Sequence, residues 1–205
     1  MNNNEPNLLK SGGKLITFDG QHGAGKSFIT KFVSDKLVSA GYSVITTNEP
    51  TNSEIGTLAR NSEQCYVGKV LACLFAADRH QHCKFIMEKL SEGNIILCDR
   101  YLISALILQN MDDVEFDYTM SLNNGVVNPN LQIVLYADSK IIDERFKSKS
   151  SISRLAYQER AENYDRYQHY KTELERCVGS ITYILNNSIL DAENIAKYIL
   201  QQLEH

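Results

Sequence analysis

Gly20-Gln21-His22-Gly23-Ala24-Gly25-Lys26-Ser27 is the segment from which the rest of the chain can be interpreted. It matches G-x-x-x-x-G-K-[ST], in which a glycine-rich turn directs successive backbone N–H groups towards phosphate oxygens. Lys26 supplies an ammonium group for the β- and γ-phosphates of a nucleotide, and the Ser27 hydroxyl is a ligand for Mg²⁺. A glycine-rich turn without a ligand explains the glycines, but not lysine and serine at these offsets. The segment therefore predicts a P-loop that binds the phosphates of a nucleotide together with Mg²⁺.

The flanking sequence has the character that a P-loop requires. Residues Lys14–Asp19 form a short apolar run rich in residues that favour strands. After the loop, apolar residues recur at helical spacing, at Ile29, Phe32, Val33, Leu37 and Ala40. We expect a strand, a glycine-rich turn and an amphipathic helix.

Composition limits the class of protein. With 205 residues, 43% hydrophobic and 22% charged, the chain suits one ordinary α/β domain. Its net charge of −4 disfavours a nucleic-acid surface or an anionic membrane as partner. Five scattered cysteines without a C-x-x-C pair indicate buried, reduced thiols rather than disulfides or metal ligands. We found no apolar run of membrane-spanning length and no signal-peptide core, and we expect a loose tail over residues 1–12 and a cytoplasmic protein.

Strand and helix signals alternate along the rest of the chain. Further strands are expected at 43–47, 94–99, 131–136 and 181–185, and helices at 53–59, 65–90, 104–109, 139–146 and 191–203. The long helix is expected because apolar residues recur at helical spacing, at Val67, Val70, Leu71, Leu74, Phe75, Phe85, Ile86 and Leu90. This order predicts a three-layer α/β/α fold, with a parallel sheet between helices, as a single domain over residues 13–205.

Two further segments suit phosphate chemistry. The strand that ends at Asp99 has the Walker-B arrangement, which places a carboxylate near the Mg²⁺ of a P-loop. The segment Arg145–Arg154 is basic, rich in serine and poor in apolar residues. For a charge run alone a solvated loop is the favoured interpretation. In a phosphate-handling protein the segment also suits a mobile lid, at about residues 146–157, that closes over the transferred phosphoryl group.

The order of these motifs resembles the thymidylate kinase family, from about Lys14 to Leu203. The P-loop is followed by Glu49-Pro50, then by Leu74-Phe75-Ala76-Ala77-Asp78-Arg79, then by Asp99-Arg100-Tyr101 and the basic segment. The resemblance implies a five-stranded parallel sheet, a homodimer, and transfer of the γ-phosphoryl group of ATP to dTMP.

The resemblance also assigns roles to individual residues. ATP would be held by the P-loop residues Gly20 to Ser27, with Arg145 near the adenine, and Mg²⁺ by Ser27 and Asp99. Phe75 would stack on the acceptor base, Arg79 would bind the base edge, and Arg100 would hold the acceptor phosphate as a bidentate fork. Residues assigned to the acceptor site are Glu49, Phe75, Arg79, Arg100, Ser104 and Gln109. Residues assigned to catalysis are Lys26, Asp99, Lys149 and Arg154.

Three positions depart from the family pattern. His22, Asn48 and Leu108 stand where many members have aspartate, arginine and tyrosine, and all three are expected to face the acceptor. Purely structural roles would also explain the site residues. Phe75 could be a core residue, Arg79 could pair with a nearby glutamate, and Asp99-Arg100 could be a structural ion pair. The alternatives are therefore a kinase for another nucleotide or small molecule, a nucleotide-binding regulator without kinase activity, and a simple ATPase.

Overall fold

The computed structural model describes residues 12–147, 153–157 and 165–204. Residues 1–11 of the predicted tail and residues 148–152 of the predicted lid, which include Lys149, lie outside the described residues. The division into a tail, one domain and a lid therefore stays a prediction.

Five parallel strands form the predicted sheet. They are β1 (Lys14–Asp19), β2 (Val44–Asn48), β3 (Ile95–Asp99), β4 (Leu131–Tyr136) and β5 (Thr182–Leu185), in the spatial order β2-β3-β1-β4-β5. The central strand β1 lies between β3 and β4, so the carboxyl ends of these three strands meet at one edge. The register pairs Phe18 with Asp99, which places the Walker-B carboxylate beside the start of the P-loop.

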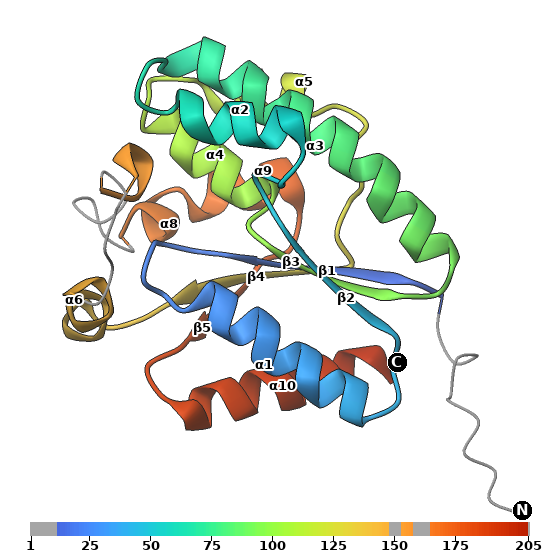
Figure 1. Ribbon diagram of the computed structural model, residues 1–205. Helices are drawn as coiled ribbons and strands as arrows, with labels where there is room; N and C mark the ends of the chain where they lie inside the picture. The colour runs from blue at the N-terminus through green and yellow to red at the C-terminus, as the bar shows by residue number, and fades with distance from the viewer. Residues whose placement is uncertain (1–11, 148–152, 158–164, 205) are drawn as a thin grey trace, which may run out of the picture.

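Helices cover both faces of the sheet (Figure 1). On one face lie α1 (Lys26–Ser39) and α10 (Ile189–Leu203). The other face is covered by α2 (Glu54–Ser62), α3 (Gly68–Ser91), α4 (Leu102–Asn110), α5 (Phe116–Leu122) and α9 (Lys171–Val178). Two short helices, α6 (Ser139–Lys147) and α8 (Asp165–His169), lie at the end of the sheet where β1 and β4 finish. The three-layer α/β/α fold predicted from the sequence is confirmed.

Alternating strand residues supply the two halves of the core. Ile16, Phe18 and Leu97 face α1 and α10, whereas Leu15 and Ile96 face the helices of the other layer. Both sets are almost fully buried, because strands covered on both faces expose neither side to water.

The start of α2 and the long helix α3 show what periodicity can and cannot predict. Ser53 caps α2 as expected, since its hydroxyl accepts a hydrogen bond from the Gly56 N–H. In α3 the apolar residues Leu71 and Ile86 are buried. Three other apolar residues of the predicted helix, Val67, Val70 and Phe85, are 62%, 55% and 39% exposed. This helix carries apolar residues on several faces, and only the packing against the sheet decides which face is covered.

The cysteine prediction was partly wrong. Cys83 and Cys98 are buried free thiols as expected, and burial raises the pKa of the Cys98 thiol. Cys65 and Cys73 are exposed instead. Among the described residues, the model contains no helix that combines the length and apolar character needed to cross a bilayer.

Candidate active site

The P-loop is a tight turn between β1 and α1. Gly20 has φ 124°, and a Cβ atom there would overlap the carbonyl oxygen of Leu135 on β4. Only glycine fits this close approach of two strands. The helix α1 begins at Lys26, and the Lys26 ammonium, which is buried, donates hydrogen bonds to the carbonyl oxygens of Gly20 and Gln21. The P-loop therefore surrounds the Lys26 ammonium, which lies at the positive N-terminal end of α1.

Arg145 and Asn186 brace the outer side of this loop. The Arg145 guanidinium donates to the carbonyl oxygens of Gly23 and Asn186, each at 3.0 Å. The Asn186 side-chain amide donates to the Ala24 carbonyl oxygen at 2.7 Å. Burial lowers the pKa of Arg145 from its ordinary value. The structure thus places Arg145 against the P-loop, on the wall of a cavity of about 420 Å³ that the loop also lines.

Ser27 and Asp99 form the candidate metal site. The Ser27 hydroxyl donates to the Asp99 carboxylate over 2.5 Å, across the step from α1 to β3. Hydroxyl and carboxylate oxygens are hard ligands of the kind that Mg²⁺ takes, and Mg²⁺ beside a nucleotide needs only one or two carboxylates in addition to phosphate oxygens. This donor pair fits Mg²⁺, which when bound would neutralise phosphate charge during transfer.

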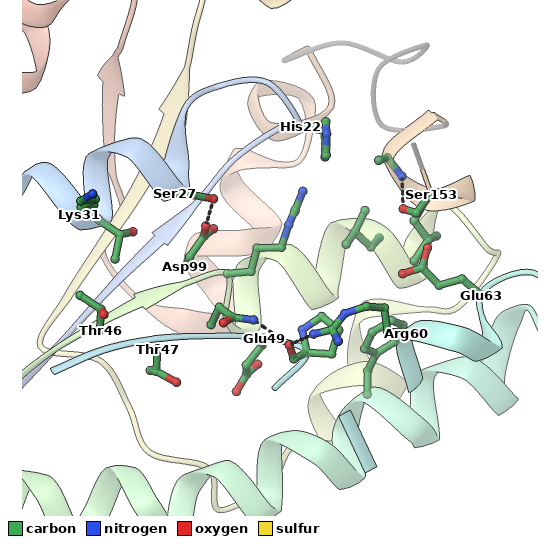
Figure 2. Close-up of a pocket in the computed structure, with 18 of the residues that line it drawn as sticks. His22, Ser27, Lys31, Thr46, Thr47, Glu49, Arg60, Glu63, Asp99 and Ser153 are labelled. Atoms are coloured by element: carbon green, nitrogen blue, oxygen red, sulfur yellow. Dashed lines mark hydrogen bonds between the residues drawn. The ribbon is translucent and has the colours of Figure 1, made fainter. Parts of the chain in front are cut away.

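A larger cavity of about 780 Å³ opens next to the P-loop (Figure 2). Its wall includes the acceptor-side residues Glu49, Phe75 and Arg100. The three positions that depart from the family pattern, His22, Asn48 and Leu108, line the same cavity. Their predicted grouping on one side of the site is therefore seen in the structure.

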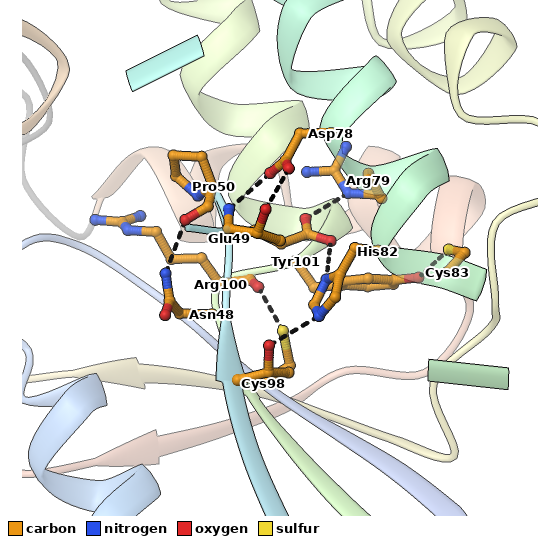
Figure 3. A network of polar contacts seen from close by, with 12 residues as sticks. Asn48, Glu49, Pro50, Asp78, Arg79, His82, Cys83, Cys98, Arg100 and Tyr101 are labelled. Carbon is orange, nitrogen blue, oxygen red and sulfur yellow. Dashed lines mark hydrogen bonds and ion pairs between the residues drawn. The ribbon is translucent and has the colours of Figure 1, made fainter. Parts of the chain in front are cut away.

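Buried charges behind this cavity form one connected network (Figure 3). The Glu49 carboxylate accepts a hydrogen bond from Arg79 Nε at 2.7 Å and lies 2.9 Å from His82 Nδ1, while His82 Nε2 lies 2.8 Å from the Thr47 hydroxyl. Burial acts to lower the pKa of Arg79, but the Glu49 charge and Tyr101 outweigh it, so that the pKa rises. Arg79 is consequently a fixed cation with a dedicated counter-charge.

Arg100 stands at the junction between the two sides of the site. It has φ 69°, an uncommon backbone conformation for a residue other than glycine, and its N–H donates to the Phe18 carbonyl oxygen. Its guanidinium donates to the Ser104 hydroxyl at 3.3 Å. Further along α4, Gln109 lines a small inner cavity, and its buried Oε1 has no hydrogen-bond partner among the described residues. An unpaired buried amide oxygen at a cavity wall suits a ligand donor.

Comparison with known proteins agrees with this geometry. The family model described as thymidylate kinase matches residues 18–199. The chain belongs to the thymidylate kinase family. It is accordingly a phosphotransferase, with nucleotides as its ligands.

Members from distant organisms align over most of the chain. A protein named thymidylate kinase from Bacillus licheniformis is 29% identical over 210 residues, covering 94% of each chain. A probable thymidylate kinase from Methanococcus aeolicus is 31% identical over 184 residues, covering 88% of this chain and 84% of its own. Another probable thymidylate kinase, from Pyrococcus horikoshii, is 33% identical over 150 residues, covering 69% of this chain and 73% of its own.

Arg154, which the sequence assigns to a lid, is hydrogen-bonded away from the P-loop. The Arg154 guanidinium donates to both carboxylate oxygens of Asp112 at 2.7 Å and to the Glu63 carbonyl oxygen at 2.7 Å. Hydrogen bonding to Asp112 raises the pKa of Arg154. Arg154 is not among the residues lining the large cavity, although Ser153 and Leu155 are. The structure therefore does not bring Arg154 together with Lys26 and Asp99.

Two residues at or beside the candidate site were not singled out in the sequence analysis. Arg60, on α2, lines the large cavity and donates to the carbonyl oxygens of Pro50 and Thr51. Asp19, at the end of β1, accepts hydrogen bonds from the N–H groups of Tyr101 and Ser104 and so holds the first turn of α4. An acidic residue directly before the P-loop was a visible signal for Asp19, but no local pattern marks Arg60.

Proposed function

We propose that the chain transfers the γ-phosphoryl group of ATP to dTMP, with the two nucleotides on either side of Ser27, Asp99 and Arg100. The observation that carries this proposal is the meeting of the two large cavities. His22, Ser27, Asp99 and Arg100 line both of them. In-line transfer needs donor and acceptor to meet at one point, with positioning and charge stabilisation supplying most of the catalysis.

On the donor side, the backbone N–H groups of the P-loop and the Lys26 ammonium bind the phosphates of ATP. Ser27 and Asp99 hold Mg²⁺, for which their oxygen ligands are suited. In the structure, Lys26 bonds to loop carbonyl oxygens, so binding exchanges these bonds for bonds to phosphate oxygens. Arg145 contacts ATP from the same side, as its place on the wall of the smaller cavity supports.

On the acceptor side, Arg100 and Arg60 bind the dTMP phosphate from two directions. Phe75 stacks on the base, and Arg79 and Gln109 bind its edge in the inner cavity, which all three residues line. Asn48 lines the large cavity at a position where many family members have arginine. Arg60, which lines the same cavity, supplies a positive charge there. Glu49 and Ser104 serve this site by holding Arg79 and Arg100, respectively.

In the closed state, Arg154 leaves Asp112 and stabilises the transferred phosphoryl group, together with Lys149. A cation at this place contributes on the order of 10³-fold in rate. Its support here is the basic lid sequence and the position of Ser153 and Leu155 on the cavity wall.

The active form is proposed to be a homodimer. Val67, Val70, Cys73 and Ala77 are exposed at three- and four-residue spacing at the start of α3 and so share a face. A second copy that covers this stripe would bury its apolar side chains. The cytoplasmic location expected from the sequence stays a prediction.

A panel of acceptors tests the proposed function. ADP release with Mg²⁺ and ATP is measured for dTMP, dUMP, dCMP, dGMP and a no-acceptor control. Turnover that is fastest with dTMP supports the proposal. Turnover with another nucleotide would identify an altered acceptor, ADP release without acceptor would indicate an ATPase, and binding without turnover would indicate a regulator.

Lys26→Ala tests the assignment of the P-loop. It is expected to abolish ADP production, because no ammonium remains to bind the β- and γ-phosphates. Its circular dichroism spectrum should match that of the unmodified protein. Full activity in this variant contradicts the P-loop assignment.

A further inference from the structure

Asn123, at the carboxyl end of α5, contacts the guanidinium that is proposed to read the acceptor base. Its side-chain oxygen Oδ1 accepts a hydrogen bond from Arg79 Nη1 at 2.6 Å, and both side chains are 4% exposed. Asn123 does not line any of the three cavities described above. It therefore touches Arg79 from behind, on the side away from a ligand.

The amide of Asn123 is itself held in one orientation. Its Nδ2 donates to the Thr119 carbonyl oxygen at 2.7 Å, one turn earlier in α5. With the amide nitrogen used in this way, the oxygen is the atom that faces Arg79. A donor nitrogen turned towards the guanidinium would leave two donors opposed in a buried place.

Two further residues, Glu49 and Tyr101, hold the Arg79 guanidinium. Nε donates to the Glu49 carboxylate at 2.7 Å, and the guanidinium carbon lies 5.6 Å from the centre of the Tyr101 ring (Figure 3). With Nη1 donating to Asn123, Nη2 is the guanidinium nitrogen without a hydrogen-bond partner within the described part of the chain. Because the guanidinium is planar, fixing Nε and Nη1 also fixes the direction of Nη2.

We propose that Asn123 is a positioning residue that sets the base selectivity of the acceptor pocket by orienting Arg79. The inference rests on the proposed function and deepens it. With Nη2 left as a donor, the pocket requires a hydrogen-bond acceptor on the base, such as the carbonyl oxygen of a thymine or uracil ring. A base that presents an exocyclic amine at the same place, as cytosine does, meets donor with donor and is rejected.

The test compares Asn123→Leu with Asn123→Asp. Leucine has a similar size and no oxygen, so it removes the bond to Arg79. Aspartate loses the bond to the Thr119 carbonyl oxygen but keeps an oxygen for Arg79. For Asn123→Leu we expect the KM for dTMP to rise about tenfold or more, as loss of a hydrogen bond to a charged group implies. The KM for ATP should stay within twofold, and the preference for dTMP over dCMP should fall. Asn123→Asp should restore the KM for dTMP and the preference to near their original values.

His80→Ala is the structural control. His80 Nε2 donates to the Leu122 carbonyl oxygen at 2.9 Å, so its side chain joins α3 to the same end of α5 through a bond in which the Arg79 guanidinium takes no part. If Asn123 only joined these helices, His80→Ala would raise the KM for dTMP as Asn123→Leu does. We expect His80→Ala to lower the melting temperature alone. Asn123→Ala replaces the leucine variant if leucine prevents folding, with the same expected result.

Separate outcomes overturn the inference and the function. If the unmodified protein phosphorylates dTMP and Asn123→Leu keeps its KM and its preference over dCMP within twofold, the role of Asn123 is rejected and the function stands. Equal effects of His80→Ala and Asn123→Leu also reject it. If the unmodified protein phosphorylates none of the nucleotides, the proposed function fails, and the role of Asn123 fails with it.

Discussion

The two arginines Arg79 and Arg60 at the acceptor pocket differ in burial and in their hydrogen-bond partners. Arg79 is buried against the Glu49 carboxylate, whereas Arg60 is exposed and, within the part of the chain that the structure describes, bonds to backbone carbonyl oxygens alone. Arg79 is thus part of the folded framework, and Arg60 is able to exchange its carbonyl partners for a phosphate at little cost. Substitutions at the two residues should differ accordingly.

Arg60→Ala is expected to weaken dTMP binding without affecting ATP. Loss of one charge-assisted contact to a dianion costs roughly 1.5–3 kcal/mol, which corresponds to a KM about ten- to a hundredfold higher. The melting temperature should hardly change, because the side chain is exposed. Steady-state kinetics with each nucleotide varied in turn measures both KM values, and an unchanged KM for dTMP would exclude Arg60 from the acceptor site.

Asp19 gives a prediction for pH dependence. Burial raises the pKa of this carboxyl above its value in the unfolded chain, although hydrogen bonds from Ser104 and Tyr101 oppose the shift. Its contribution to stability is therefore complete below the ordinary pKa of about 3.9 and is lost as the pH rises through the folded-state pKa. An asparagine side chain in its place would keep an oxygen for both N–H groups but carry no charge. The stability of Asp19→Asn relative to the unmodified protein should accordingly increase with pH over this window.

Urea unfolding of both proteins between pH 4 and pH 8 measures this difference. Because the comparison is between pH values, a constant cost of the substitution cancels. A difference in unfolding free energy that is the same at every pH would show that Asp19 does not titrate in this way.

At the scale of elements, the proposed lid movement involves the ion pair of Arg154 with Asp112. The bidentate bond joins the helical segment at 154–157 to the turn after α4, and Asp112 is almost fully buried. Such a pair holds the arginine in the conformation seen here, and the proposed closure would have to exchange Asp112 for the charge of the transferred group.

Arg154→Ala and Asp112→Asn distinguish the conformation in which Arg154 is bonded to Asp112 from the proposed closed state. The first is expected to reduce kcat by about a thousandfold if Arg154 meets the transferred group. The second removes only the charge that holds Arg154 back, so kcat should stay within a factor of a few or rise. Presteady-state and steady-state turnover measure both. Equal losses in the two variants would mean that the bond to Asp112 belongs to the active state.

At the scale of the whole molecule, the exposed stripe on α3 tests the proposed dimer. Val70→Asp places a charge on this stripe, where it costs little in a monomer but is buried without a partner in a dimer. Light scattering coupled to size-exclusion chromatography should show a dimer for the unmodified protein and a monomer for the variant. Lys84→Asp, an exposed change further along α3, is the control. Monomers in both samples would reject the dimer.

The fold and the donor side were predictable because their signals are local. A P-loop, a strand ending in Asp99 and the alternation of strands with helices each occupy a few consecutive residues, and their backbone conformations follow from glycine, strand propensity and helical spacing. Ser53 before α2 and the end of β3 were located for the same reason.

The amino-acid sequence by itself determined the P-loop, the order of the elements and the family pattern of the acceptor motifs. Only the tertiary structure decided that Asn123 contacts Arg79 across 44 residues of chain and that Arg154 pairs with Asp112 across 42. It also decided which face of α3 is left exposed. The physical reason is that these contacts depend on how helices pack on the sheet, and no local pattern records which distant side chains then meet.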